Sequence, residues 1–369
     1  MGPAFVIFMV CCLFIQILFW VICSFNLKKN KRLPARNIVD IPSVSIVICA
    51  RNEADNLRKN LPSFLRQKNI RLEVIVVNDN SEDDTGRVLT EYAADYPHLK
   101  VINAAPRTGP GKKAALQQGL EAATSSVILL SDADCEPECE NWAYLMSREI
   151  IAGISIVGGY SPFAEESSTI NAYARFENVI TALQYIGLGR AGISYMGVGR
   201  NIGYDRSALR SVGYFESHKN VTSGDDDLTV QSVLGKEKGN TMTFLTSRES
   251  FVWSAGPADL RHYIRQKLRH YSVSGRYPIH ISMILGLFAL SWLGFYLSLV
   301  VLLWLGLWKE AILLSVAHYG IRLLCWSTIK SALQQRFTLL QIILFDGLYP
   351  VLTLFLTIFG LLKKTKHWK

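Results

Sequence analysis

The feature that most constrains this chain is an apolar segment near its start, Ala4–Phe25, in which only Gln16 and Ser24 are polar. A helix of this length crosses the roughly 30 Å apolar core of a bilayer. A signal peptide would instead begin with positive charge and have a shorter apolar region. Here the basic residues follow the segment, so by the positive-inside rule the next part of the chain faces the cytoplasm. These residues are Lys28, Lys29, Lys31, Arg32 and Arg36.

Three further apolar stretches lie towards the other end of the chain: Ile281–Leu307, Ala311–Ile329 and Thr338–Leu362. The second contains Arg322, and the third contains Asp346, Gly347 and Pro350. A charge inside a membrane span is costly, and proline interrupts helical hydrogen bonding. The sequence therefore predicts two or three C-terminal spans. It leaves open whether the last stretch crosses the membrane, and which side holds the lysines at 363–369.

The charge of the chain does not favour a nucleic-acid-binding protein. The net charge is +9, from 39 Lys and Arg against 30 Asp and Glu. Residues 38–278 hold 26 of the basic and 28 of the acidic residues, so the basic excess belongs to the apolar ends. A nucleic-acid-binding domain would carry that excess itself. We therefore expect an N-terminal membrane helix (1–27), a basic linker (28–41), a cytoplasmic domain (42–278) and a C-terminal membrane region (279–369).

The seven cysteines predict neither a disulfide framework nor a zinc site. Four lie in the apolar stretches, and Cys49 ends a predicted strand. Cys135 and Cys139 form one C-x3-C pair without a matching second pair, whereas a structural zinc site needs four ligands. We expect reduced cysteines that pack in the interior, as is usual on the cytoplasmic side.

The cytoplasmic part begins as an α/β domain. Short β-branched runs alternate with helical patterns, which predicts parallel strands joined by crossover helices. In such sheets ligands bind at the carboxyl ends of the strands, where this chain has its polar clusters. The predicted strands are Val44–Cys49, Leu72–Val77, Leu99–Asn103 and Ser126–Leu130, and helices are expected up to about Gln67, over 84–95 and over 112–123.

The second half of the domain is less regular. Its many glycines predict turns, among them turns at Gly187 and Gly189. Near its end, Arg261–Tyr271 has a basic helical pattern directly before the first C-terminal span. We expect this helix to lie along the membrane surface, with its cations near anionic head groups.

One pair of acids has the spacing of a metal site. Asp132 and Asp134 follow the buried strand Ser126–Leu130. Two carboxylates in a strand-end turn can bind one Mg²⁺ or Mn²⁺ ion, which prefers oxygen ligands and bridges to a diphosphate. A solvated turn is the simpler interpretation of such a pair, and the position at a strand end favours the metal site.

Three other polar residues follow strands or open helices. Asp79 could accept a hydrogen bond from a pyrimidine N–H, or this segment could only cap a helix through Ser81, Asp83 or Asp84. Glu53 could contact a ligand or only offset a helix dipole. Lys112 lies in Gly109–Lys113, which is not a Walker A loop because alanine follows the lysines, yet a lysine there could reach a diphosphate.

The acidic run Asp225–Asp227 opens a predicted helix. Buried like charges raise one another's pKa, so such runs are usually exposed, unless one carboxylate points into a site as a general base. Further along, Gln266 and Arg269 belong to the basic helix. A guanidinium can grip a diphosphate with two hydrogen bonds, although a solvated helix at the membrane is the simpler interpretation.

Together these residues resemble the family 2 glycosyltransferases, membrane-bound inverting enzymes with a GT-A fold, over roughly 42–275. Each motif alone is weak, but six in the family's order between membrane segments are a strong signal. The matching segments are Ala50–Glu53, Val77–Ser81 for V-D-D-x-S, Gly111–Ala115 for G-K-x-x-A, Asp132–Asp134 for D-x-D, Gly224–Asp226 for the G-D-D or E-D base motif, and Gln266–Arg269 for Q-x-x-R-W.

The resemblance implies a role for each matched residue. The nucleotide sugar would bind in 42–135 and the acceptor in 136–278. The implied donor contacts are Asp79 to uracil, Glu53 and Lys112 to the nucleotide, Asp132 and Asp134 through Mg²⁺ or Mn²⁺ to the diphosphate, and Gln266 and Arg269 near the diphosphate. The implied base is Asp226, with Asp225 second, and the acceptor side would include Gly199, Asn201 and His270.

Two positions depart from the family pattern. Asn78 replaces the first Asp of V-D-D, although Asp79 remains. His270 stands where Q-x-x-R-W has Trp, a residue that binds the acceptor in processive polysaccharide synthases. The resemblance therefore implies a multi-pass protein of the inner membrane that transfers one sugar from a UDP-sugar to a lipid-linked or glycan acceptor. A processive synthase and a non-catalytic nucleotide-sugar-binding protein are the alternatives.

Overall fold

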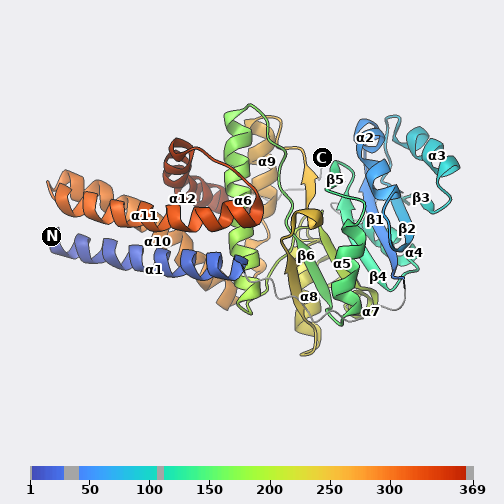
Figure 1. Cartoon of the computed structure of the whole chain (residues 1–369), viewed down its shortest axis with the longest axis horizontal. Coiled ribbons are helices and arrows are strands. Elements are labelled where there is room, and N and C mark those ends of the chain that lie inside the picture. The colour runs from blue at the N-terminus through green and yellow to red at the C-terminus, as the bar shows by residue number, and fades with distance from the viewer. Residues whose placement is uncertain (1, 29–40, 106–111, 363–369) are drawn as a thin grey trace. The chain divides into compact units, whose positions relative to one another are not determined.

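The computed structural model of the chain describes residues 2–28, 41–105 and 112–362, coloured along the chain in Figure 1. These residues form two compact units. Of the described residues, one unit gathers 2–28, 167–193 and 257–362, and the other gathers 41–105, 112–166 and 194–256. The segment expected to form one cytoplasmic domain, 42–278, thus contributes to both units. The expectations for the lysines at 363–369 and for the basic linker lie mostly outside the described residues.

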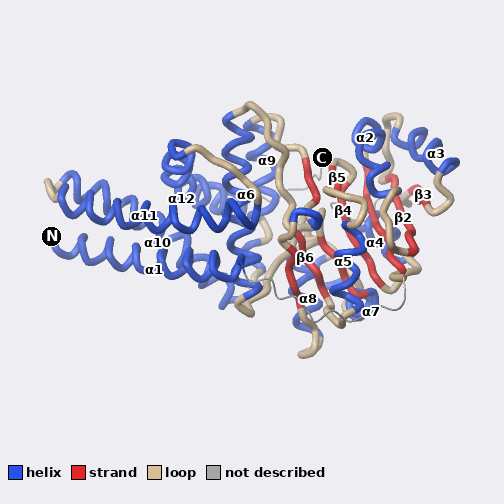
Figure 2. The backbone as a smooth tube through the Cα atoms, viewed as in Figure 1, coloured by secondary structure: helices blue, strands red, loops and turns tan. Residues whose placement is uncertain are grey.

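The second unit is built on a seven-stranded sheet, drawn in red in Figure 2, with the order β3-β2-β1-β4-β7-β6-β8. The first four strands along the chain pair in parallel, which confirms the prediction of an α/β fold. Strand β7 runs antiparallel to both β4 and β6, so the sheet is mixed. The strands are β1 (Ser43–Ala50), β2 (Arg71–Asn78), β3 (Leu99–Asn103), β4 (Val127–Asp132), β6 (Ile156–Gly159), β7 (Ile202–Asp205) and β8 (Met242–Leu245), beside a short pair of β5 (Cys135–Pro137) and β9 (Val252–Ser254).

Helices cover both faces of this sheet because its strands are apolar on both faces. In β1, Ile46 and Ile48 point into one core while Val47 and Cys49 point into the other, as the two-residue period of a strand requires. The helices on the first face are α2 (Ala54–Leu65), α3 (Thr85–Asp95) and α5 (Trp142–Ile151). Those on the second are α4 (Lys113–Ala122), α7 (Arg206–Ser211) and α8 (Asp227–Lys236).

The first unit is helical. Four of its helices are long and apolar enough to cross a membrane, judged by length and composition. They are α1 (Gly2–Lys28), α10 (Ile279–Trp304), α11 (Trp308–Leu333) and α12 (Leu339–Leu362). The remaining two are α6 (Thr169–Arg190) and α9 (Leu260–Tyr271), the helix predicted at Arg261–Tyr271.

Helix α12 continues through Pro350, the residue for which the sequence left a full span open. Its Asp346 also has a partner, because the Asp346 Oδ1 atom lies 2.7 Å from Arg322 Nη1 and its Oδ2 atom lies 3.0 Å from His318 Nε2. Arg322 donates a second contact to Gln16 Oε1 at 2.9 Å. The charges of Arg322 and Asp346, which made these spans costly in the sequence, therefore compensate each other between α11 and α12. Gln16 of α1 adds a hydrogen bond to the same arginine.

The turns predicted at Gly187 and Gly189 are wrong, because both glycines lie inside helix α6. The glycines serve close packing: a Cβ atom at Gly187 would lie 2.6 Å from the Cβ atom of Cys23 in α1. At the same end, Arg190 Nη1 donates to the carbonyl oxygen of Leu27 at 2.6 Å. Small residues that let two helices approach are typical of membrane-helix packing, and here they join α6 to α1.

Candidate active site

The acidic residues predicted from separate motifs meet at one edge of the sheet. Strands β1, β2 and β4 are parallel, with Ala50 opposite Asn78 and Cys49 opposite Asp132. Their carboxyl ends therefore lie side by side, and the residues that follow them share this edge. The arrangement places Glu53, Asp79 and Asp132 at the end of the sheet where a ligand is expected.

Asp79 is held rigidly at the end of β2. It is 1% exposed, and its backbone N–H donates to the carbonyl oxygen of Ala50 at 2.8 Å. Asn80 follows in the left-handed conformation with φ 53°. Asn78 Oδ1 accepts from the backbone N–H of Ser81 at 3.2 Å, so the asparagine that departs from V-D-D serves the turn.

The capping role considered for these loops falls mainly to Asp83. Its two oxygens accept from the backbone N–H groups of Ala54 at 3.1 Å and Thr85 at 3.0 Å, at the starts of α2 and α3. Burial alone would raise the pKa of Asp83, but the hydrogen bonds with Thr85 and Ala54 outweigh it and hold the pKa below its usual value. Glu53 precedes α2 without capping it through its side chain, and it accepts from the Asn56 amide. The side-chain caps at the starts of α2 and α3 therefore come from Asp83.

Lys112 connects the metal-site motif to the acidic run. Its Nζ atom lies 2.8 Å from Asp132 Oδ1 and 3.1 Å from Asp225 Oδ2. Burial alone would raise the pKa of Asp225, but the Lys112 ammonium outweighs it, and the pKa lies below the usual value. The two carboxylates in turn hold the pKa of Lys112 well above its usual value, despite its burial. Asp225 is therefore a carboxylate in an ion pair.

Asp226 has different surroundings. Its Oδ1 atom accepts from the backbone N–H of Asp227 at 2.9 Å and its Oδ2 atom from that of Gly199 at 3.1 Å. Burial, together with the charge of Asp225, raises the pKa of Asp226 above its usual value. Asp227 is buried and accepts from the N–H of Leu228 at 2.9 Å. The run is therefore a helix start, as the sequence suggested, and in the structure each acid has its own environment.

The residues at the D-x-D motif suit a hard divalent cation. One oxygen each from Asp132 and Asp134 and the sulfur of Cys135 lie within 4.8 Å of one another. Burial and the neighbouring Asp134 raise the pKa of the Cys135 thiol well above its usual value. Sulfur is also a softer ligand than Mg²⁺ or Mn²⁺ prefers. The usable donors are the carboxylate oxygens, which match Mg²⁺ or Mn²⁺.

Gly199 and Asn201 take different places in the glycine-rich segment. Gly199 faces the acidic run, whereas Asn201 is fully buried. The Asn201 amide accepts from Trp142 Nε1 at 3.0 Å and donates to the carbonyl oxygens of Tyr160 at 2.8 Å and Ser250 at 2.9 Å. Asn201 thus holds the segment in place from the interior, a role that no local sequence pattern indicated.

The residues of the Q-x-x-R motif belong to the helical unit. Gln266, Arg269 and His270 lie in α9, so their contact with the donor or the acceptor stays a prediction. Helix α9 is fixed in that unit by the buried Glu177, which accepts from Tyr263 at 2.7 Å and pairs with Lys267 at 2.8 Å.

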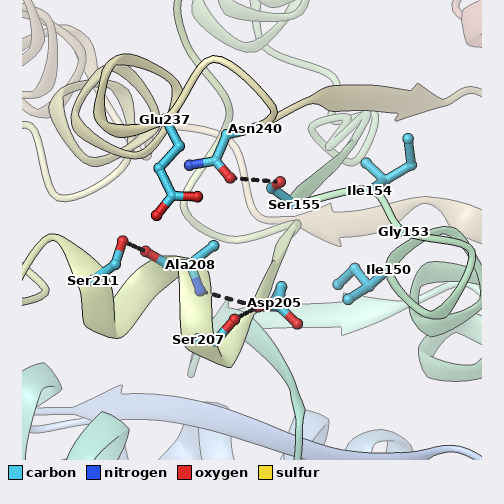
Figure 3. A pocket seen from close by; sticks show the side chains of 10 residues that line it. All are labelled: Ile150, Gly153, Ile154, Ser155, Asp205, Ser207, Ala208, Ser211, Glu237 and Asn240. Carbon is cyan, nitrogen blue, oxygen red and sulfur yellow. Dashed lines mark hydrogen bonds between the residues drawn. The ribbon is translucent and has the colours of Figure 1, made fainter.

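A cavity of about 460 Å³, shown in Figure 3, lies away from these acids. Its lining includes Asp205, which is opposite Val127 at the amino end of β4. Asp205 already caps α7 by accepting from the N–H of Ala208, and Asn240 accepts from Ser155. The cavity is therefore at the far end of β4 from the candidate site.

Comparison with known proteins gives consistent matches. Residues 45–213 match the family model described as glycosyl transferase family 2. The chain is 28% identical over 242 residues to the probable glycosyltransferase YdaM of Bacillus subtilis, covering 63% of this chain and 55% of the relative. It is 29% identical over 208 residues to the beta-monoglucosyldiacylglycerol synthase of a Nostoc species, covering 53% of this chain and 42% of the relative.

A solved structure supports the fold over nearly the whole chain. The mannosyltransferase PcManGT of Pyrobaculum calidifontis, in complex with GDP-Man and Mn²⁺, is 17% identical, and the match covers 95% of this chain and 99% of that one with a TM-score of 0.60. The chain spans about half the length of the curated relatives it matches. The GT-A fold expected from the motifs is confirmed. The family-model match over residues 45–213, together with the relatives named as glycosyltransferases, makes this chain similar to glycosyltransferase family 2.

Proposed function

We propose that this protein transfers one sugar from a UDP-sugar to a lipid-linked or glycan acceptor at the cytoplasmic face of the inner membrane. One observation carries the proposal. Lys112 lies within 3.1 Å of both Asp132 and Asp225, so the G-K, D-x-D and base motifs converge on one site. A diphosphate, a cation and an acceptor hydroxyl must meet within such a site for glycosyl transfer.

The donor would bind along the carboxyl ends of β1, β2 and β4. Asp79 offers a rigid carboxylate acceptor to the pyrimidine N–H of uracil, and Glu53 follows the neighbouring strand. Lys112 can turn its ammonium from the two carboxylates towards the diphosphate. A lysine so placed serves as a point charge for phosphate.

Asp132 and Asp134 would hold Mg²⁺ or Mn²⁺ between their carboxylates and the diphosphate. The bound cation would stabilise the negative charge of the departing nucleotide diphosphate. The solved mannosyltransferase is a complex with Mn²⁺ and a nucleotide sugar, which supports a metal at this kind of site. Without a cation, two carboxylates and a diphosphate would repel one another.

The reaction is one in-line displacement with inversion. The acceptor oxygen forms a bond to the anomeric carbon while the bond from that carbon to the diphosphate oxygen breaks. A base accepts the proton of the acceptor hydroxyl. We assign Asp226 as the base because its raised pKa favours proton acceptance and two backbone N–H groups fix its direction. Asp225 is the second candidate because it shares Lys112 with the metal-site acid Asp132.

A lipid acceptor is favoured by the helical unit. Four helices suited to a membrane belong to it, and a relative is named as a synthase of a glycosyldiacylglycerol. His270, in the place of the tryptophan of processive synthases, favours single transfer. Product length separates single transfer from polymer synthesis, and loss of donor hydrolysis separates an enzyme from a nucleotide-sugar-binding protein.

The test is a panel of nucleotide sugars on the purified full chain in lipid, with release of nucleotide diphosphate as the measurement. We expect release from one UDP-sugar, loss of release in EDTA, and recovery on addition of Mn²⁺ or Mg²⁺. In the Asp132→Asn and Asp134→Asn variants, addition of Mn²⁺ or Mg²⁺ should not restore the release of nucleotide diphosphate. Full release in EDTA would refute the metal assignment, and no release from any donor with any lipid extract would refute the enzyme assignment.

A further inference from the structure

A second lysine, directly after Lys112, is placed unlike an ordinary helix-start lysine. Lys113 is the first residue of α4 and is only 3% exposed. Its Nζ atom donates to the carbonyl oxygens of His218 at 2.9 Å, Val221 at 2.9 Å and Ser223 at 2.7 Å. An ammonium has three N–H donors, which matches the number of carbonyl oxygens that this one segment presents to Lys113.

That segment leads directly into the acidic run. Residues 219–224 form no helix or strand, and Gly224 has φ +83°. An irregular backbone must satisfy its polar groups through side chains. Lys113 supplies donors for three carbonyls, while Thr229 Oγ1 donates to the carbonyl of Asp225 at 2.9 Å. His218 Nε2 lies 3.2 Å from the same Thr229 oxygen. The backbone position of Asp225 and Asp226 therefore depends on this network of contacts, in which Lys113 holds the preceding segment.

We infer that Lys113 is a positioning residue for catalysis, which ties the segment 218–223 and the acids after it to the start of α4. The inference rests on the proposed function. Two neighbouring lysines would then divide the work. Lys112 contacts the carboxylates of Asp132 and Asp225, and Lys113 holds the backbone that presents the base. The positive charge of Lys113 also lowers the pKa of Asp225, after the larger effects of burial and Lys112.

The test uses Lys113→Met in the full chain, with Lys100→Met as the matched control. Lys100 is exposed in β3 and reaches a single carbonyl, that of Ala122, at 3.4 Å. In Lys113→Met we expect kcat to fall about 100-fold, because a small misplacement of a reacting group has that effect. Nucleotide affinity, measured by calorimetry with Mn²⁺, should change less than about twofold because the base does not touch the nucleotide. The control should match the wild type in both.

Amide hydrogen exchange over 216–228 gives a measurement independent of activity. Exchange should accelerate there in Lys113→Met, with the strands β1 and β2 unchanged. Lys113→Arg keeps the charge but cannot converge on three carbonyls, so it should fold and still lose most of kcat. If Lys113→Met does not fold, Lys113→Arg alone carries the test.

Two results would overturn the inference: unchanged kcat and exchange in these variants, or equal losses of kcat and nucleotide affinity. If the wild type transfers no sugar yet exchange accelerates over 216–228 in Lys113→Met, the proposed function fails while the contact of Lys113 with the segment stands.

Discussion

At the scale of single residues, three identical side chains in a row have three different environments. Asp225 pairs with Lys112, Asp226 accepts from two backbone N–H groups, and Asp227 is buried at the start of α8. The sequence indicated a helix start with one carboxylate aimed into a site. It could not distinguish Asp225 from Asp226, because the contacts that separate them come from Lys112 and Gly199, more than twenty positions away.

Asp226→Asn should abolish transfer and leave nucleotide binding nearly intact. An amide cannot take the acceptor proton, and loss of a general base costs about 10²–10⁴-fold in rate. Asp79→Ala should weaken nucleotide binding first, because a nucleotide contact acts in the ground state and the transition state alike. Single-turnover rates and calorimetry on the same preparations measure both. An active Asp226→Asn beside an inactive Asp225→Asn would move the base to Asp225.

Asp225→Asn should shift the acidic limb of the pH–rate profile to lower pH. Asp226 must be ionised to act as a base, so activity rises with pH through its pKa. Burial raises that pKa first, and the charge of Asp225 raises it further. Removing the Asp225 charge lowers the pKa of Asp226 and extends activity towards acid. The measurement is kcat against pH for both proteins, and a limb that moves to higher pH would contradict the assignment.

At the scale of secondary-structure elements, the sheet could be predicted and the packing of the membrane helices could not. The four parallel strands were predicted to within two residues at each end, because β-branched runs between turns specify them locally. Helix α6 was not predicted, since the turn signal of Gly187 is local and its contact with Cys23 is not. The sequence also left open whether the stretch with Pro350 forms a full span, because a proline in a membrane helix is tolerated only where neighbouring helices satisfy the backbone groups that it frees.

The pair formed by Arg322 and Asp346 should contribute strongly to the stability of the helical unit. The Arg322 guanidinium also lies 4.4 Å and 4.1 Å from the ring centres of Trp20 and Trp292, so the cation contacts α1, α10 and α12. Breaking a buried ion pair on one side leaves an uncompensated charge and costs about 3–5 kcal/mol. Asp346→Asn and Arg322→Leu should therefore each lower the unfolding temperature in detergent markedly.

The double variant Arg322→Leu with Asp346→Leu is the decisive comparison. Replacing both charges with apolar side chains leaves no unpaired buried charge. The double variant should therefore be more stable than either single variant. Lys330→Met, an exposed charge in the last turn of α11, serves as the control and should leave the unfolding temperature unchanged. Additive losses in the double variant would mean that the two charges do not stabilise each other.

At the scale of the whole molecule, four helices suited to a membrane make the topology testable. Each crossing changes the side of the membrane, and the basic residues after α1 predict a cytoplasmic catalytic unit. The short connection between α10 and α11 would then face outwards. The connection between α11 and α12 would face inwards.

We expect a membrane-impermeant maleimide to label Lys309→Cys in intact cells, and to label Thr338→Cys and Ser211→Cys only after the cells are opened. Lys309 lies next to the α10–α11 connection, and Ser211 is exposed at the end of α7. Labelling of the unsubstituted chain measures the background from its own cysteines. Labelling of Ser211→Cys from outside would invert the topology and remove access to cytoplasmic nucleotide sugars.

The contact of α6 with α1 has a consequence for the order in which the chain matures on the ribosome. Both helices are synthesised before residue 191, whereas α9 to α12 come only after residue 260. At roughly 5–20 residues per second, α6 exists for several seconds with α1 as its sole partner from this unit. We therefore expect the Gly187–Cys23 packing and the hydrogen bond from Arg190 to Leu27 to form before α9 to α12 are synthesised. A ribosome-bound chain arrested at residue 256 should already protect α6 from protease, and bulky replacement of Gly187 should remove that protection.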